Sequence, residues 1–296
     1  MRRLASCLLL LVGILATAAT AWADAIDQLL AQAGLAATEI DRKSGGKNWG
    51  EIFGSYFSDR PFGRSVALII GVNRYEGNAW PQLDATRGDP ARVRKLLVEQ
   101  EGFDLVVTLE NERATKERID TLMRDVLPDL LRRDDRFLFY FSGHGTQREI
   151  QGVGYAGYLP LTNSGRSYGR MVSMADLREW DRQLTPVKQV LFLLDACFSG
   201  IAGAQPMSEH PNLKVGRLAD YSHHLITAGT AGEQTIAGDA WSGSIFTDSL
   251  IRGAEGWADK GWEDTRNKIP KDGVVSLFEL KDYITKRIAA EVPRES

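Results

Sequence analysis

The chain has 296 residues, of which 43% are hydrophobic and 25% are charged. This composition is ordinary for a globular protein, and the length allows one or two packed domains. The formal charge of −3 gives no electrostatic footprint for nucleic acid, so we expect no nucleic-acid partner. There are only two cysteines and no C-x-x-C pair, which excludes a disulfide scaffold and a cysteine-cluster zinc site.

Residues 1–23 have the pattern of a secretory signal peptide. Arg2 and Arg3 precede an apolar run from Leu4 to Ala19, and the A-x-A motif at 21–23 is typical of a cleavage site. We therefore expect an exported protein, periplasmic or secreted, with no membrane attachment after signal removal. An uncleaved anchor helix is the alternative, but the run is short for a hydrocarbon core of about 30 Å.

Residues 24–63 form a separate N-terminal segment in this interpretation. Apolar residues near helical spacing predict a short amphipathic helix over 24–40. Residues 41–63 are rich in Gly, Ser and aromatic residues, which favours an extended lead-in whose rings dock on the main domain. We treat 24–63 as a candidate prodomain and 64–296 as the main domain.

From residue 65 onward, apolar runs typical of buried strands alternate with helical segments. The predicted strands are 66–70, 105–109, 137–141, 190–194 and 225–228. The predicted helices are 89–100, 115–131, 173–183, 244–252 and 276–290. Asp89 is expected to cap the first of these helices, with Pro90 at its first position. The alternation predicts an α/β fold with a mostly parallel sheet and helices on both faces.

Two of the predicted strands end in reactive side chains. The strand at 137–141 is followed by Ser142, Gly143, His144 and Gly145, and the strand at 190–194 leads into Asp195 and Cys197. Ligands of open α/β sheets bind outside the carboxyl ends of the strands, and neighbouring strands lie about 4.8 Å apart. We therefore expect His144 and Cys197 to share a site.

The chemistry of this pair is nucleophilic catalysis. A thiolate is the reactive form of cysteine, and a nearby imidazole can take the thiol proton and later protonate a leaving amine. The amides of Gly145 and Cys197 are then candidates for an oxyanion hole. Taken alone, either side chain is more simply a structural residue, so the prediction depends on the two together.

These motifs resemble those of caspase-like cysteine peptidases of the bacterial metacaspase (orthocaspase) type. The similar segments are ALIIGVNRY (67–75), ATRGD (85–89), YFSGHG (140–145), DACFSG (195–200), TAGTAGE (227–233) and SIFT (244–247). The resemblance spans about residues 65–290 and implies a caspase-like three-layer sandwich. It also implies that His144 is the general base and acid and that Cys197 is the nucleophile.

The resemblance further implies that Asp89 and Asp195 line the pocket for the substrate residue before the scissile bond. An acidic pocket selects Arg or Lys, because a carboxylate binds a guanidinium strongly and with two hydrogen bonds. Each aspartate has a simpler alternative: Asp89 as a helix cap, and Asp195 as a residue that only holds its own loop.

The connection at 198–222 contains Lys214 and Arg217, which are candidate autoprocessing sites for an enzyme that cuts after basic residues. The alternative is a solvated loop with ordinary surface charges. The chemistry requires no cofactor, and the resemblance leaves calcium open as an activator. Asp259, Glu263, Asp264 and Asp272 lie in or beside one loop, but their spacing is not that of an EF-hand, so no metal ligands are assigned.

The sequence thus predicts an exported cysteine endopeptidase that cleaves peptide or protein substrates after Arg or Lys. One alternative is a catalytically silent caspase-fold module for binding or signalling, because a fold does not guarantee activity. Another is a different thiol hydrolase, such as an amidase acting on a non-peptide substrate.

Overall fold

The computed structural model describes residues 30–31, 33–42, 62–152, 154–196, 222–228, 237–238, 241–259, 262–264, 267–269, 271 and 273–291. The predicted signal peptide at 1–23, Cys197, the processing candidates Lys214 and Arg217, and Asp272 lie outside the described residues. Within the described ranges, no helix is long and apolar enough to cross a membrane.

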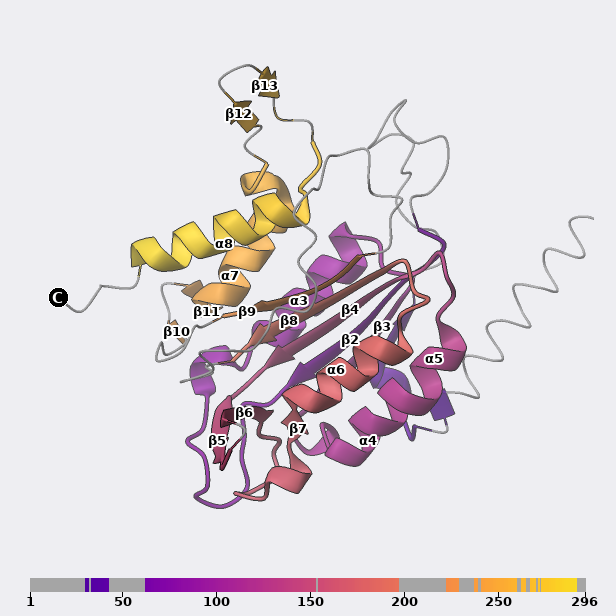
Figure 1. Cartoon of the computed structure of the whole chain (residues 1–296), viewed down its shortest axis with the longest axis vertical. Helices are drawn as coiled ribbons and strands as arrows, with labels where there is room; N and C mark the ends of the chain where they lie inside the picture. The colour runs from indigo at the N-terminus through magenta and orange to yellow at the C-terminus, as the bar shows by residue number, and fades with distance from the viewer. Residues whose placement is uncertain are drawn as a thin grey trace, which may run out of the picture.

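A six-stranded sheet forms the middle layer of the molecule (Figure 1), with the strand order β1-β3-β2-β4-β8-β9. Its strands are β1 (Ile40–Arg42), β2 (Ser65–Gly71), β3 (Leu105–Glu110), β4 (Arg136–Ser142), β8 (Gln189–Asp195) and β9 (Ser222–Thr227). All neighbours are parallel except β1, which pairs antiparallel with β3. The predicted mostly parallel sheet is therefore confirmed.

Helices cover both faces of the sheet, as Figure 1 shows. One layer consists of α4 (Lys116–Thr121), η6 (Leu122–Val126), α5 (Leu127–Leu130) and α6 (Met174–Gln183). The other consists of α3 (Asp89–Lys95), η4 (Leu96–Gln100), α7 (Ile245–Arg252), η10 (Gly253–Trp257) and α8 (Leu277–Glu291). The three-layer α/β sandwich predicted from the sequence is thus present.

The two helix layers bury two separate apolar clusters against the sheet. Successive residues of a strand point to opposite faces, so Leu68 and Ile70 of β2 join the cluster under α4 and α6, whereas Ala67 and Ile69 join the one under α3 and α7. All seven residues of β2 are buried. This burial on both faces explains why the strand is a continuous apolar run in the sequence.

Three short antiparallel strands follow β4 and were not predicted from the sequence. They are β5 (Thr146–Ile150), β6 (Gly154–Leu159) and β7 (Val172–Ser173). Two further ribbons are β10 (Ala237–Gly238) with β11 (Gly243–Ser244), and β12 (Trp262–Asp264) with β13 (Asn267–Ile269). Strand β5 begins two residues after His144, so the small sheet adjoins the predicted site.

The N-terminal segment differs from its predicted helix over 24–40. Among its described residues, Leu30 and Ala31 are helical, but a turn follows at 33–34, then η1 (Ala37–Glu39) and β1. Leu30 and Ala33 are buried in the cluster under α4. Residues 30–42 are therefore built into the main domain, where β1 covers the otherwise open edge of β3.

Candidate active site

The carboxyl ends of β4 and β8 lie side by side, as the sequence predicts. Ser142, the last residue of β4, is in register with Asp195, the last residue of β8. The amide of Gly143 donates a hydrogen bond of 3.2 Å to the carbonyl of Asp195, which joins the two chains just beyond the sheet. His144 follows Ser142 by two positions, and Cys197 follows Asp195 by two positions. The contact between thiol and imidazole stays a prediction, because Cys197 lies outside the described residues.

The imidazole of His144 is held in one orientation. Its Nε2 lies 3.0 Å from the carbonyl oxygen of Pro81. A carbonyl can only accept, so the neutral ring carries its proton on Nε2 and leaves Nδ1 as the acceptor. Burial lowers the pKa of His144 from its usual value, against the opposing effect of the Pro81 carbonyl. The geometry therefore favours a neutral ring that can accept a proton.

Two aromatic residues of the loop after β2 fix this ring further. Its centroid lies 5.1 Å from that of Tyr75 and 5.8 Å from that of Trp80. The Tyr75 hydroxyl accepts a 2.8 Å hydrogen bond from the amide of His144 and donates to the carbonyl of Val72 at 3.1 Å. Tyr75 therefore connects the His144 loop after β4 to the end of β2.

Trp80 is fixed by the loop that follows β6. Its indole Nε1 donates a 2.7 Å hydrogen bond to the carbonyl of Gly165, and the Arg166 guanidinium lies 4.3 Å from its ring centroid. No role is predicted for Tyr75 or Trp80 from the sequence. A usable signal was their position, since both lie in the loop that leaves the carboxyl end of a buried strand.

Asp89 and Asp195 converge on one buried site, which we call the acidic pair. Asp195 is 3% exposed and Asp89 is 0% exposed. The Ser244 hydroxyl donates to Asp195 Oδ1 at 2.8 Å, while the Ser244 amide donates to Asp89 Oδ2 at 2.9 Å. Thr247 Oγ1 donates to Asp195 Oδ2 at 2.6 Å. The two aspartates that the sequence analysis placed together are thus bridged by one residue at the start of α7.

The predicted capping role of Asp89 is wrong. Gly88 occupies the N-cap position of α3, and Asp89 is the first residue of the helix, followed by Pro90. The Asp89 carboxylate turns to the Ser244 amide and to Arg92 instead of capping its own helix. Tertiary contacts near the end of β8, and not the local sequence, therefore decide the partners of Asp89.

Burial also changes the acidity of the pair. Burial, followed by the neighbouring charge of Asp195, raises the pKa of Asp89 to about 7 against the opposing hydrogen bonds of Ser244 and Arg92. Burial raises the pKa of Asp195 to about 6, with Thr247 and Ser244 opposing. Two carboxyl groups in one site do not both ionise easily, so the pair retains a proton close to neutral pH.

Strand β11 lies against the acidic pair. Gly243 of β11 has φ +150°, and a Cβ at this position would overlap the Asp89 carboxylate. Only a glycine lets the backbone pass this close to the carboxylate. Gly243 and Ser244 of β11 therefore lie directly against the buried acidic pair.

Gly145, the other predicted oxyanion donor, lies between His144 and the start of β5.

Among the described residues, the acidic residues near the C-terminal loop do not form a metal site. Asp259 is buried, and its Oδ2 accepts a hydrogen bond of 3.0 Å from the amide of Gly273. Glu263 and Asp264 lie on β12. In the described part of the chain, no three His, Cys, Asp or Glu side chains form a group that could hold a metal ion, and the structure assigns no calcium ligand.

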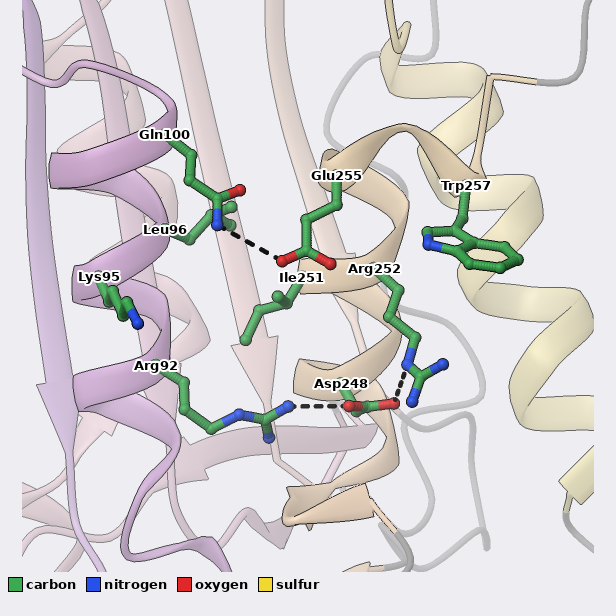
Figure 2. Close-up of a pocket in the computed structure, with 9 residues that line it drawn as sticks. All are labelled: Arg92, Lys95, Leu96, Gln100, Asp248, Ile251, Arg252, Glu255 and Trp257. Atoms are coloured by element: carbon green, nitrogen blue, oxygen red, sulfur yellow. Dashed lines mark hydrogen bonds and ion pairs between the residues drawn. The ribbon is translucent and has the colours of Figure 1, made fainter.

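A pocket of about 400 Å³ lies between α3 with η4 and α7 with η10 (Figure 2). Its lining residues are Arg92, Lys95, Leu96, Gln100, Asp248, Ile251, Arg252, Glu255 and Trp257. His144 is not among them. The pocket touches the acidic pair only through Arg92, whose guanidinium contacts Asp89.

Comparison with known proteins agrees with the observed fold. Residues 64–269 match the family model described as the caspase domain, and the chain belongs to this caspase-like protease family. It is 33% identical over 153 residues to metacaspase-3 of Arabidopsis thaliana, which covers 47% of the chain and 41% of that protein. It is 24% identical over 258 residues to a probable protease of a Desulfuromonadales bacterium, which covers 77% of the chain and 30% of that protein. The matched regions thus span less than half the length of either relative.

Two solved structures share the fold. A protein from Geobacter sulfurreducens superposes with a TM-score of 0.53 at 18% identity, covering 78% of this chain and 90% of that one. Caspase-1 from Spodoptera frugiperda superposes with a TM-score of 0.52 at 14% identity, covering 79% of this chain and 81% of that one. At these identities the likeness establishes the caspase-like architecture alone.

Proposed function

We propose that the protein is an exported cysteine endopeptidase that hydrolyses peptide bonds after Arg or Lys, with Cys197 and His144 as a catalytic dyad. One observation carries the proposal. At the carboxyl end of β4, the His144 ring is held with Nε2 on the Pro81 carbonyl, and the adjacent strand end leads in two residues to Cys197. The free Nδ1 is then the nitrogen available to the thiol.

In this mechanism Nδ1 of His144 takes the Cys197 proton, and the thiolate attacks the substrate carbonyl carbon. The amides of Gly145 and Cys197 are the proposed donors to the developing oxyanion. The C–N bond then breaks as the imidazolium gives its proton to the leaving amine. Water hydrolyses the thioester and regenerates the thiol. The lowered pKa of His144 supports its start as a neutral base.

The acidic pair supports the choice of a basic substrate residue. Asp89 and Asp195 are the carboxylates next to the catalytic strand ends, and both contact Ser244. A guanidinium or ammonium group that enters this buried site gains strong ionic hydrogen bonds. The same specificity makes Lys214 and Arg217 candidate sites of self-cleavage, because they follow the proposed nucleophile within one connection.

The remaining parts of the proposal concern location and activation. The pattern of residues 1–23 supports export to the periplasm or the outside of the cell. Calcium is proposed as an activator and not as a participant in the chemistry. Adding the ion to purified protein tests this directly, and chelation reverses the effect if it is genuine.

The test compares the wild type with Cys197→Ala on fluorogenic peptides that end in Arg, Lys or Asp, with and without calcium. We expect the wild type to cleave the basic peptides and Cys197→Ala to lose all activity with an unchanged unfolding temperature. Ser199→Ala is the matched control, since it removes a hydroxyl two residues away and should retain activity.

Each failure has a distinct meaning. Full activity in Cys197→Ala would remove the proposed nucleophile, and a preference for Asp-ended peptides would remove only the specificity. A wild type that neither cleaves nor reacts with a thiol-directed, Arg-bearing probe would favour the silent binding module. Mass spectrometry of both proteins in parallel reports signal removal and any self-cleavage at Lys214 or Arg217.

A further inference from the structure

We propose that Arg92 is the resident counter-ion of the acidic pair and thereby determines how well the site accepts a basic substrate side chain at neutral pH. This inference rests on the proposed function, because it concerns the same specificity site. Arg92 belongs to α3, and neither the motifs of the sequence nor the dyad chemistry gives it a role.

The guanidinium of Arg92 is held between two carboxylates. Nη1 donates to Asp89 Oδ1 at 3.2 Å, and Nη2 donates to Asp248 Oδ1 at 2.8 Å. Nη1 also lies 3.2 Å from the carbonyl of Trp241 and 3.3 Å from that of Ser242, just before the ribbon residue Gly243. Figure 2 shows Arg92 reaching from α3 across to Asp248 on α7.

Asp248 holds the Arg92 guanidinium in place but does not neutralise it, because Asp248 is shared with two other arginines. Its Oδ2 lies 3.1 Å from Arg252 Nε and 2.6 Å from Arg287 Nη1. Three arginines therefore surround one buried carboxylate, and an excess of positive charge remains on the side that faces Asp89. A planar guanidinium with several donors can contact both carboxylates in this way.

The charges around Asp89 then decide what the site can accept. The described residues place one cation, Arg92, against Asp89, while Asp195 of β8 is a second potential anion. Tyr140 of β4 also faces the pair but stays neutral, since burial raises the pKa of its hydroxyl well above the usual value. Two buried carboxylates that are both ionised need two cations. Arg92 supplies one, and the arginine or lysine of the substrate supplies the other.

The number of cations beside the acidic pair predicts whether the pair holds a proton. In the free enzyme, Arg92 balances one carboxylate and the other keeps a proton near neutral pH. Binding of a basic side chain expels that proton. Without Arg92 the pair has no resident cation, retains its proton to higher pH and accepts a basic side chain less well at pH 7.

The test is the pH dependence of kcat/KM for an Arg-ended peptide in Arg92→Gln. We expect the acid limb to move up by about one pH unit and kcat to change much less. KM at pH 7 should rise about fivefold, because a carboxyl of pKa about 7 falls from about half ionised to about a tenth ionised when its pKa rises by one unit. Arg252→Gln is the matched control, because it also pairs with Asp248 but does not touch Asp89. Arg92→Lys keeps the charge and should restore most of the wild-type profile.

A second readout does not depend on cleavage. Carbon-13 NMR titration of the aspartate carboxyls in Cys197→Ala, assigned with Asp89→Asn, reports the acidity of the pair directly. We expect Arg92→Gln to raise the apparent pKa of the pair and Arg252→Gln to leave it in place. Arg92→Gln should raise the apparent pKa of the acidic pair even if the wild type cleaves no peptide. In that case the proposed function fails and the counter-ion role of Arg92 stands.

The opposite pattern overturns the inference. If the wild type cleaves after Arg but Arg92→Gln shifts neither the acid limb nor the carboxyl titration, Arg92 is not the counter-ion. An equal shift in Arg252→Gln would also overturn it. If Arg92→Gln does not fold, Arg92→Lys decides, because a wild-type profile with retained charge supports the inference and a shifted profile contradicts it.

Discussion

At the scale of single residues, the orientation of His144 comes from neutral groups. The Pro81 carbonyl selects the tautomer, and Tyr75 and Trp80 hold the ring. A carbonyl places the ring without adding a charge that would hold a proton on it. This arrangement suits a base that must be neutral before the reaction and charged during it.

The Tyr75 hydroxyl carries a testable part of this arrangement. Tyr75→Phe keeps the ring beside His144 but leaves the His144 amide and the Val72 carbonyl without their hydrogen bonds. An unmade hydrogen bond to a buried group costs about 1–3 kcal/mol. We expect a loss of stability in this range, measured by urea unfolding, together with a fall in kcat at little change in KM. Tyr155→Phe is the control, because Tyr155 is 56% exposed, and an equal loss there would contradict the assignment.

The raised pKa of Asp195 predicts that the free energy of unfolding depends on pH. Its pKa is about 6 in the folded protein and about 3.9 in an unfolded chain. Between these values the folded state holds a proton that the unfolded state has lost, so the free energy of unfolding falls as the pH rises from about 4 to 6. Asp195→Asn removes this effect, and its stability relative to the wild type should improve as the pH rises.

The measurement is urea unfolding of both proteins at several pH values between 4 and 7.5. Asp195→Asn also alters the hydrogen bonds with Ser244 and Thr247. A loss of stability that is the same at every pH does not change how the difference in unfolding free energy between the two proteins varies with pH. Asp282→Asn on α8 is the control, since Asp282 pairs with Lys286 on the surface. Parallel stability curves for Asp195→Asn and the wild type would show that the Asp195 carboxyl is not protonated by burial.

At the scale of elements, the sequence predicts best where one physical signal dominates. Strands β2, β3, β4 and β8 are long apolar runs buried on both faces, and each lies within about two residues of its predicted bounds. The helices predicted at 173–183 and 276–290 each begin with a capping box, which is a local signal. The adjacency of β4 and β8, which defines the site, follows from this pattern and from the resemblance together.

The elements that escaped prediction depend on partners distant in the chain. Strand β1 has three residues and exists through its pairing with β3. Strands β5 and β6 carry no clear apolar alternation, because β5 has no buried residue and β6 buries only Gly157 and Leu159. Asp89 precedes a proline at a helix start, which predicts a cap, yet Ser244, 155 positions later, takes the carboxylate. Local propensity loses to tertiary contacts in each case.

Substitution of Glu39 tests whether residues 30–42 are held to the main domain. It is 5% exposed and pairs with Arg113 at 2.8 Å and with Arg118 at 3.2 Å. Removing one partner of a buried ion pair leaves the other charges without compensation, so Glu39→Ala should cost about 2 kcal/mol. We expect faster hydrogen exchange in β3, which becomes the edge strand when β1 detaches.

The control for this prediction is Glu112→Ala. Glu112 pairs with Arg74 on the surface, where both side chains are more than half exposed, and such pairs contribute about 0–1 kcal/mol. If Glu39→Ala leaves exchange in β3 unchanged, or if Glu112→Ala weakens the protein as much, residues 30–42 are not held to the sheet by Glu39.

At the scale of the whole molecule, one sheet serves two cores. Ile69 and Ile70 are neighbours on β2, both 0% exposed, yet they pack in the opposite clusters beneath α3 and beneath α4. Because the same strand backbone supports both clusters, the two layers should unfold together in one transition. This coupling also connects the acidic pair, beside α3 and α7, to the His144 loop at the same strand ends.

Ile69→Val and Ile70→Val test this coupling with the same chemical change on each face. Each deletes one buried methylene, which costs about 0.5–1.5 kcal/mol, and both should lower the urea midpoint of a single transition without changing its slope. Ile150→Val, at a position 37% exposed, should have little effect. Two transitions, with Ile69→Val shifting one and Ile70→Val the other, would show that the helix layers fold independently. In that case a substitution beneath α4 would leave the acidic pair undisturbed, whereas a shared transition means that loss of either core dismantles the site.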